Sequence, residues 1–187
     1  DMICRKLDLQ PGDRLLEIGS GWGGFAIFAA QNYGCHVTTT TISREQYAFA
    51  EARIREAGLE DRVTLLAEDY RDLTGRYDKL VSIEMIEAVG HQFHATFFQK
   101  CCELLEPHGK MLLQAITIAD QRFDAYKKDV DFIRRYIFPG GMLPTKAILA
   151  REIATAGMRL AETFSFGSSY AETLRRWYEA FSERWAA

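Results

Sequence analysis

The sequence predicts an α/β fold with a doubly wound, mainly parallel sheet and helices on both of its faces. Short apolar runs of strand length alternate along the chain with amphipathic stretches of helical period. A glycine-rich turn follows the first of these runs, and such a turn often joins a strand to a helix in nucleotide-binding sheets. With 187 residues, 48% of them hydrophobic and 26% charged, the chain is expected to form one globular domain over residues 1–187.

Individual residues support the expected elements. Ser43 and Gln46 form a capping box at the start of one helix, and Gly58 is a good stop for it. Gly75 and Gly157 separate later elements. The expected strands are residues 14–19, 36–41, 63–69, 79–85, 110–118 and 159–166. The expected helices are residues 24–33, 43–57, 92–105, 145–156 and 170–185.

Residues 119–144, between the fifth strand and the next helix, form a longer connection than is usual in such folds. We therefore expect a substrate-side insertion there, which is a lid, a cap helix or a wall of a substrate channel. An apolar stripe on the segment fits a hydrophobic channel, and a small helix packed on the core explains it equally well. The stripe consists of Phe132, Ile133, Tyr136, Ile137 and Phe138.

Composition excludes several classes of function. The net charge of −3 gives no reason to expect nucleic-acid binding. No apolar run reaches transmembrane length, so any membrane contact is expected to be peripheral. The four cysteines contain no C-x-x-C pair, so no metal site is predicted and reduced thiols in a cytoplasmic protein are expected. Both chain ends lie within helical patterns, which indicates a fragment of a longer protein.

The glycine turn predicts a cofactor site but leaves the cofactor class open. Gly19, Gly21 and Gly24 satisfy G-x-G-x-x-G, which suits nicotinamide and S-adenosylmethionine domains alike. A nicotinamide site needs a carboxylate at the end of the second strand, and residues 38–43 contain none. Glu17 suits the ammonium group of an amino-acid cofactor, with an exposed strand-end charge as the alternative. The pattern favours S-adenosylmethionine.

Two aromatic residues and one carboxylate fit the same cofactor. Asp69 and Tyr70 follow the third strand, where they can offer an acceptor and an aromatic edge to an adenine. Trp22 and Tyr70 can also face a sulfonium, because aromatic faces attract cations. Packing against the following helix explains Trp22 equally well.

Four segments together resemble the cyclopropane-fatty-acyl-phospholipid synthases and mycolic acid cyclopropane synthases. They are E-I-G-S-G-W-G-G at 17–24, T-I-S-R-E-Q at 41–46, S-I-E-M-I-E-A-V-G at 82–90 and Y-I-F-P-G-G-M-L-P at 136–144. The resemblance covers nearly the whole chain. It implies a class I S-adenosylmethionine-dependent methyltransferase with a Rossmann-like fold.

The resemblance also implies a reaction. Members of this family transfer a methyl group from S-adenosylmethionine to a cis double bond of a lipid acyl chain, then lose a proton and close a cyclopropane ring. The implied partner is an unsaturated phospholipid acyl chain held in a dry channel, and the implied base is a bound bicarbonate. The enzyme would be cytoplasmic with transient contact to the inner membrane face, and a homodimer is compatible with the resemblance.

The family's site residues transfer to this sequence by motif. Glu87 and Tyr170 match the glutamate and tyrosine of the bicarbonate site, with a helix-start carboxylate and a packing residue as the alternatives. Gln114 stands where many members have a histidine, and a glutamine cannot carry a proton. His91 and His94 are expected to be surface residues. The implied cofactor contacts are Glu17, Gly19, Gly21, Trp22, Gly23, Thr41, Ser43, Gln46, Asp69, Tyr70 and the backbone of Ile83.

Departures from the family pattern keep other functions open. Gln114 leaves room for a related methyltransferase that acts on another lipid or a small molecule without ring closure. The final strand of a class I sheet is also missing from the expected elements. Truncation at both ends leaves room for a non-catalytic module that binds the cofactor or a partner. A nicotinamide oxidoreductase ranks last, because the ribose carboxylate is missing.

Overall fold

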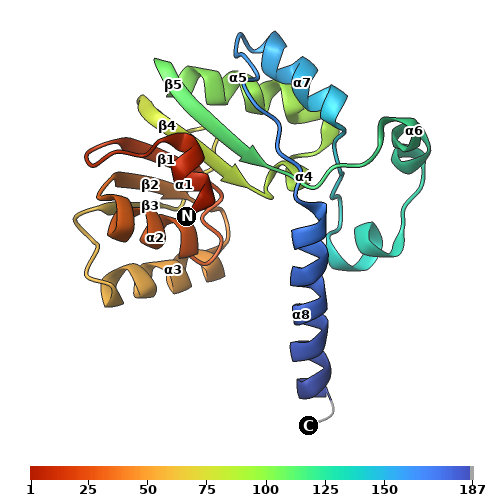
Figure 1. Cartoon of the computed structure of the whole chain (residues 1–187), viewed down its shortest axis with the longest axis horizontal. Coiled ribbons are helices and arrows are strands. Elements are labelled where there is room, and N and C mark those ends of the chain that lie inside the picture. Colours follow the sequence, from red (N-terminus) through yellow and green to blue (C-terminus); the bar gives the residue numbers. More distant parts are fainter. Residues whose placement is uncertain (186–187) are drawn as a thin grey trace.

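The computed structural model describes residues 1–185, so the expected chain end at residues 186–187 lies outside the described range. A parallel sheet in the order β3-β2-β1-β4-β5 forms the centre of this part (Figure 1). Its strands are β1 (Arg14–Ile18), β2 (His36–Thr40), β3 (Val63–Leu66), β4 (Tyr77–Ile83) and β5 (Leu105–Gln114). The helices are α1 (Met2–Leu7), α2 (Gly24–Tyr33), α3 (Arg44–Glu56), α4 (Ile86–Val89), α5 (His94–Leu104), α6 (Asp120–Lys128), α7 (Lys146–Thr155) and α8 (Gly167–Trp185), with a short 3-10 helix η1 (His91–Phe93) and a π-helical turn η2 (Ile133–Ile137).

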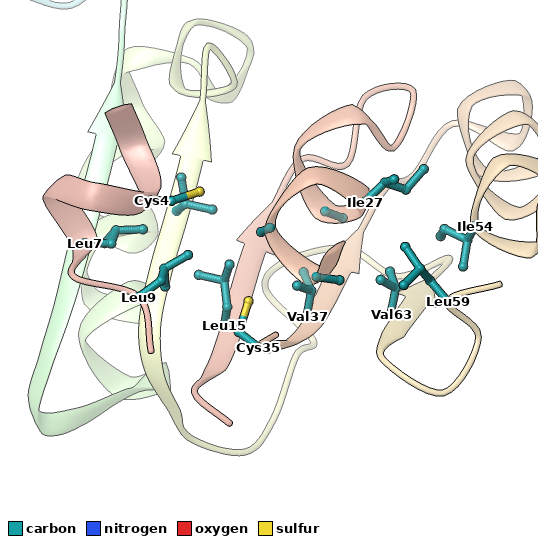
Figure 2. Close-up of a cluster of buried hydrophobic side chains, with 14 residues drawn as sticks. Cys4, Leu7, Leu9, Leu15, Ile27, Cys35, Val37, Ile54, Leu59 and Val63 are labelled. Atoms are coloured by element: carbon teal, nitrogen blue, oxygen red, sulfur yellow. The ribbon is translucent and has the colours of Figure 1, made fainter. Parts of the chain in front are cut away.

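Successive residues of β1 supply the cores on the two faces of the sheet. Leu15 lies in a cluster with buried side chains of α1, α2 and α3 (Figure 2). Leu16 lies in a second cluster with Phe97 and Phe98 of α5. A parallel strand covered by helices is buried on both faces, and β1 is buried at four successive residues, Leu15 to Ile18, with the carboxylate Glu17 among them. The predicted doubly wound fold class is confirmed.

The order of the strands places a topological switch point between β1 and β4. From β1 the chain moves outward through β2 and β3, and β4 then returns to the other side of β1. Ligands of open parallel sheets bind at the carboxyl ends of the strands beside such a point. The glycine turn follows β1 and residues 84–87 follow β4, so both predicted site segments lie at this edge.

The predicted strand at 159–166 is wrong. These residues have no strand conformation, and residues 159–165 are exposed. A strand needs a neighbour that pairs with its backbone, and nothing within residues 1–185 pairs with this segment. The segment contacts Lys6 through two side chains, the Glu162 carboxylate and the Phe164 ring.

β5 starts earlier and ends earlier than predicted. Its register against β4 shifts between the pairs Tyr77↔Leu105 and Lys79↔Lys110, so residues 106–109 bulge out of the ladder. The strand ends at Gln114, because the backbone N–H of Ile116 turns away and donates to the side chain of Glu87.

Residues 119–144 contain α6 and η2 and extend to one side of the sheet (Figure 1, right). Arg134 links the parts of this insertion, because its Nε donates to the Gly141 carbonyl at 3.0 Å and its Nη1 donates to the Tyr126 carbonyl at 2.7 Å. The apolar stripe does not pack on the core, so that alternative is wrong. Each of its side chains, Phe132, Ile133, Tyr136, Ile137 and Phe138, is at least 51% exposed.

α8 projects away from the sheet (Figure 1, blue). Its apolar side chains also face solvent, and those more than half exposed include Trp177, Tyr178, Phe181 and Trp185. Among residues 1–185, no helix combines the length and the apolar character needed to cross a membrane.

Candidate active site

The glycine turn after β1 needs glycine for two different reasons. Gly19, Gly21 and Gly23 have φ angles of 99°, 49° and 80°, a left-handed region that strains other residues. A Cβ on Gly19 would lie 3.2 Å from Met85, and one on Gly23 would lie 3.1 Å from Ala50, whereas one on Gly21 would meet nothing within 4 Å. The outer glycines therefore permit close packing, and Gly21 leaves open space where a ligand can approach the backbone.

Glu17 lies beneath this turn. Its side chain is 2% exposed, and one carboxylate oxygen accepts a hydrogen bond of 2.7 Å from Thr39 Oγ1. The alternative of an exposed strand-end charge is therefore wrong. Burial raises the pKa of Glu17 to about 8, and the bond from Thr39 opposes this only in part. Without a cation nearby, most of the Glu17 population is protonated at neutral pH.

Thr41, Ser43 and Gln46 form one hydrogen-bonded turn between β2 and α3. Ser43 Oγ accepts from the Gln46 backbone N–H at 3.2 Å, which confirms the predicted N-cap. The other half of the capping box is absent from this turn, because the Gln46 side chain accepts from Thr41 Oγ1 at 2.9 Å instead. This turn lies beside the glycine turn, since the N–H groups of Gly19 and Ser20 donate to the Thr40 carbonyl.

Trp22 lies on the surface of α3. Its ring meets Phe49 edge-on, with centroids 5.3 Å apart and planes at 81°, and it remains 54% exposed. Its carbonyl accepts from Arg53 Nη1 at 2.8 Å, which links the turn to α3. The structure therefore contains the packing contact, and it leaves one side of the indole available to a ligand.

Asp69 and Tyr70 already have partners. Asp69 accepts two side-chain hydrogen bonds from Arg71, at 2.9 and 2.7 Å, and these bonds lower the pKa of Asp69. The Tyr70 ring packs edge-on against Phe97 at 5.4 Å, and burial raises the pKa of Tyr70. A ligand at this position would share Asp69 with Arg71.

A second group of polar side chains lies at the ends of β4 and β5. Gln114 Nε2 donates to Glu84 Oε1 at 2.9 Å, and the Tyr170 hydroxyl makes a longer contact of 3.4 Å with Glu84 Oε2. Gln114 and Tyr170, which are 56 residues apart in the chain, are thus joined by one carboxylate. Sequence reasoning missed Glu84. Its position directly after β4 and three residues before Glu87 was the available signal.

Glu87 connects this group to the insertion. Its Oε1 accepts from the Ile116 backbone N–H at 2.5 Å, and its backbone carbonyl accepts from Met142 N–H at 2.8 Å. Its Oε2 is buried and has no hydrogen-bond partner within residues 1–185. Burial raises the pKa of Glu87, and the nearby Glu84 carboxylate raises it further.

The expectation that His94 is a surface residue is wrong, whereas His91 is exposed as expected. His94 is 1% exposed, and burial lowers the pKa of its imidazole. It lies on the inward face of α5 with Phe97, Phe98 and Cys101, at helical spacing. Neither histidine belongs to the polar group around Glu84.

The two parts of the site are in contact. Gly19 packs against Met85, which lies between Glu84 and the start of α4. Ser82 Oγ donates to the Ile18 carbonyl at 3.0 Å, which fixes β4 against the base of the turn. Ile83 is the last residue of β4 and pairs with Gln114, so its backbone lies at the same edge.

A separate surface hollow of about 520 Å³ lies between α5 and α7. Charged and polar residues line most of it, among them Lys100, Glu103 and Glu152. No residue predicted for the site lines it, so it does not belong to the candidate active site.

Comparison with known proteins assigns the chain to a family. A family model described as mycolic acid cyclopropane synthetase matches residues 1–187. The chain belongs to this family. Among solved structures, the mycolic acid cyclopropane synthase CmaA1 in complex with SAH and CTAB superposes with a TM-score of 0.90 at 28% identity, covering 98% of this chain and 68% of that chain.

Two curated relatives have the same sequence identity to this chain. The tuberculostearic acid methyltransferase UfaA1 of Mycobacterium tuberculosis is 42% identical over 97% of this chain and 43% of the relative. The cyclopropane-fatty-acyl-phospholipid synthase of Escherichia coli (strain K12) is 42% identical over 98% of this chain and 46% of the relative. The chain therefore spans less than half the length of these relatives.

Proposed function

We propose that the protein containing this chain transfers a methyl group from S-adenosylmethionine to the cis double bond of an unsaturated phospholipid acyl chain and forms a cyclopropane ring. One observation carries the proposal. The glycine turn, where the methyl donor would bind, packs at Gly19 directly against the segment that holds Glu84 and Glu87. In this proposal, the methyl donor and carboxylates that can accept a proton would meet at the switch point of the sheet.

The chemistry explains why both parts are needed. An alkene carbon attacks the methyl carbon, the sulfur–methyl bond breaks and S-adenosylhomocysteine (SAH) leaves. The resulting carbocation loses a proton to a base. When the proton comes from the transferred methyl group, the freed electron pair closes the ring. Such a weak nucleophile reacts only when it is aligned with the sulfonium and water is excluded.

The cofactor contacts in this proposal divide into three groups. Glu17 pairs with the ammonium group, which would return the buried carboxylate to its ionised form. The backbone at Gly19, Gly21 and Gly23 lies along the cofactor, and Trp22 offers its exposed face. The remaining proposed contacts are the β2–α3 turn (Thr41, Ser43 and Gln46), Asp69, Tyr70 and the backbone of Ile83.

The insertion supplies the proposed contact with the lipid. Its exposed apolar stripe would enter the surface of the inner membrane from the cytoplasmic side and lead an acyl chain toward Glu87. The hydrogen bond from Met142 to the Glu87 carbonyl supports this route, because it joins the insertion to the site.

A second candidate function is methylation of a lipid alkene without ring closure. The two curated relatives with different named products match at the same 42% identity, so overall similarity does not separate the outcomes. Loss of a proton from a neighbouring chain carbon, instead of from the new methyl group, would give a methyl-branched alkene.

The test uses the full-length protein with vesicles of cis-unsaturated phospholipids and S-adenosylmethionine that carries a deuterated methyl group. Cyclopropanation adds the label, removes the alkene and loses one deuterium to the base. Methylation that ends with loss of a proton from a neighbouring chain carbon keeps all the deuterium and leaves an alkene, and an alkene that remains distinguishes any open-chain product from a cyclopropane. Acyl chains that gain no label on any lipid would refute the proposal.

A matched pair of variants tests the assigned site. Glu87→Gln should lower turnover by at least about 100-fold while SAH binding stays intact. The exposed Glu60→Gln should behave like the wild type. Undiminished turnover of Glu87→Gln would show that the site lies elsewhere.

A further inference from the structure

We propose that the Glu84 carboxylate is itself the base of the reaction and takes the place of the bicarbonate that the family resemblance implies. This inference rests on the proposed function. The observation behind it is that Glu84 already occupies the hydrogen-bond donors that would hold the anion. Gln114 Nε2 and the Tyr170 hydroxyl each contact a different oxygen of this one carboxylate, at 2.9 and 3.4 Å.

A carboxylate and a bicarbonate ion present the same pair of oxygens to their donors, so one can substitute for the other in the same cradle. Glu84 reaches this position through an unusual backbone. Its φ is 51°, and within residues 1–185 only Asp8 is a further non-glycine residue with positive φ. Such a conformation strains a residue with a Cβ, and strained residues cluster at functional sites.

Charge also disfavours an added anion. Glu84 and Glu87 lie close enough for the Glu84 charge to raise the pKa of Glu87. No ion pair involving either carboxylate is present within residues 1–185. Bicarbonate would therefore be a further anion beside the Glu84 carboxylate, which already occupies Gln114 and Tyr170, and the residues present do not fit it.

The step balances with Glu84 as acceptor. The methyl-bearing carbocation gives one proton from the transferred methyl group to a Glu84 oxygen, and the C–H electron pair forms the closing C–C bond of the ring. The protonated Glu84 side chain then releases its proton to solvent. Gln114 and Tyr170 orient the carboxylate, and neither needs to carry a proton.

The decisive variant is Glu84→Gly in the full-length protein. Glycine accepts a φ of 51° without strain, so the variant should fold, and removal of the side chain leaves Gln114 and Tyr170 free to bind an anion. The matched control is Asp8→Gly, which removes an exposed carboxylate at the other such position, where φ is 56°. SAH binding checks that both variants are folded.

Turnover is measured in carbonate-free buffer and with added bicarbonate, and binding of ¹³C-bicarbonate is followed separately by NMR. We expect the wild type and Asp8→Gly to be indifferent to bicarbonate and not to bind it. Glu84→Gly should lose about 100-fold or more in turnover, bind bicarbonate, and recover at least about tenfold when bicarbonate is added.

Three results would overturn the inference. They are a wild type that needs bicarbonate, a Glu84→Gly variant that keeps its turnover in carbonate-free buffer, and a folded but inactive variant that bicarbonate neither binds nor rescues. A wild type that methylates no lipid refutes the proposed function and the role of Glu84 as base. The NMR measurement then still shows whether Glu84 excludes bicarbonate.

Discussion

Replacing Glu17 by glutamine should stabilise the cofactor-free protein and weaken its binding of the cofactor. Burial raises the pKa of Glu17 from 4.5 to about 8 on folding. A carboxyl whose pKa rises on folding contributes its full stability below pH 4.5 and loses it progressively as the pH rises to about 8. Each unit of pH in that window costs about 1.4 kcal/mol, so the wild type loses about 3 kcal/mol by pH 7.

Glutamine resembles the protonated carboxyl at every pH, so the variant avoids this loss. We expect equal free energies of unfolding near pH 4 and a variant that is more stable by about 3 kcal/mol at pH 7. Urea unfolding followed by tryptophan fluorescence from pH 4 to pH 9 measures the difference. Parallel curves for the two proteins would refute the idea that burial of an ionisable Glu17 governs the pH dependence.

The same variant tests the role of Glu17 toward the cofactor. If the ammonium group of SAH pairs with Glu17, binding lowers the pKa of the Glu17 carboxyl, and the carboxyl releases about one proton at pH 7. Calorimetry in buffers of different ionisation enthalpy detects that proton, and Glu17→Gln should bind SAH more weakly with no release. Equal affinity and no proton release in the wild type would place the ammonium group elsewhere.

Three further predictions concern packing, capping and thiols. Gly23→Ala should lower the free energy of unfolding by more than Gly58→Ala, as measured by urea unfolding. Both glycines have positive φ, but only at Gly23 would the added methyl group lie 3.1 Å from Ala50. Ser43→Ala and Thr145→Ala should each cost about 1 kcal/mol as lost N-caps, but only Ser43→Ala should weaken SAH binding by calorimetry. Iodoacetamide should label Cys102 first in the native protein, because the other three thiols are buried, and mass spectrometry of the labelled peptides shows the order.

Much of the fold was predictable because it depends on local patterns. The apolar residues of a buried strand, such as Leu15 and Leu16 of β1, can be recognised from their neighbours in the sequence. The same is true of the Ser43 cap. The strand predicted at 159–166 failed because a strand requires a partner, and partners are not visible in a local pattern. The start of β5 was missed because residues 106–109 bulge out of the ladder, so the strand begins before them, at Leu105.

The candidate site was predictable where a motif holds both the residue and its role, as for the glycine turn and Glu87. Glu84 was missed because its importance depends on Gln114 and Tyr170, which only the folded chain brings to it. His94 was misjudged because a polar residue on the inward face of a helix looks like a surface residue until its packing is known. The exposed stripe of the insertion was predicted as apolar, but its sequence does not tell whether it meets the core or solvent.

The two ends of the insertion meet. The N–H of Ile118 donates to the Pro144 carbonyl at 3.0 Å, so the intervening residues leave the sheet and return at the same point. A loop with paired ends can change in length at little entropic cost to the rest of the domain. Under the proposed function, this architecture would allow lipid selectivity to diversify through the insertion, provided that the bond from Met142 to the Glu87 carbonyl is kept.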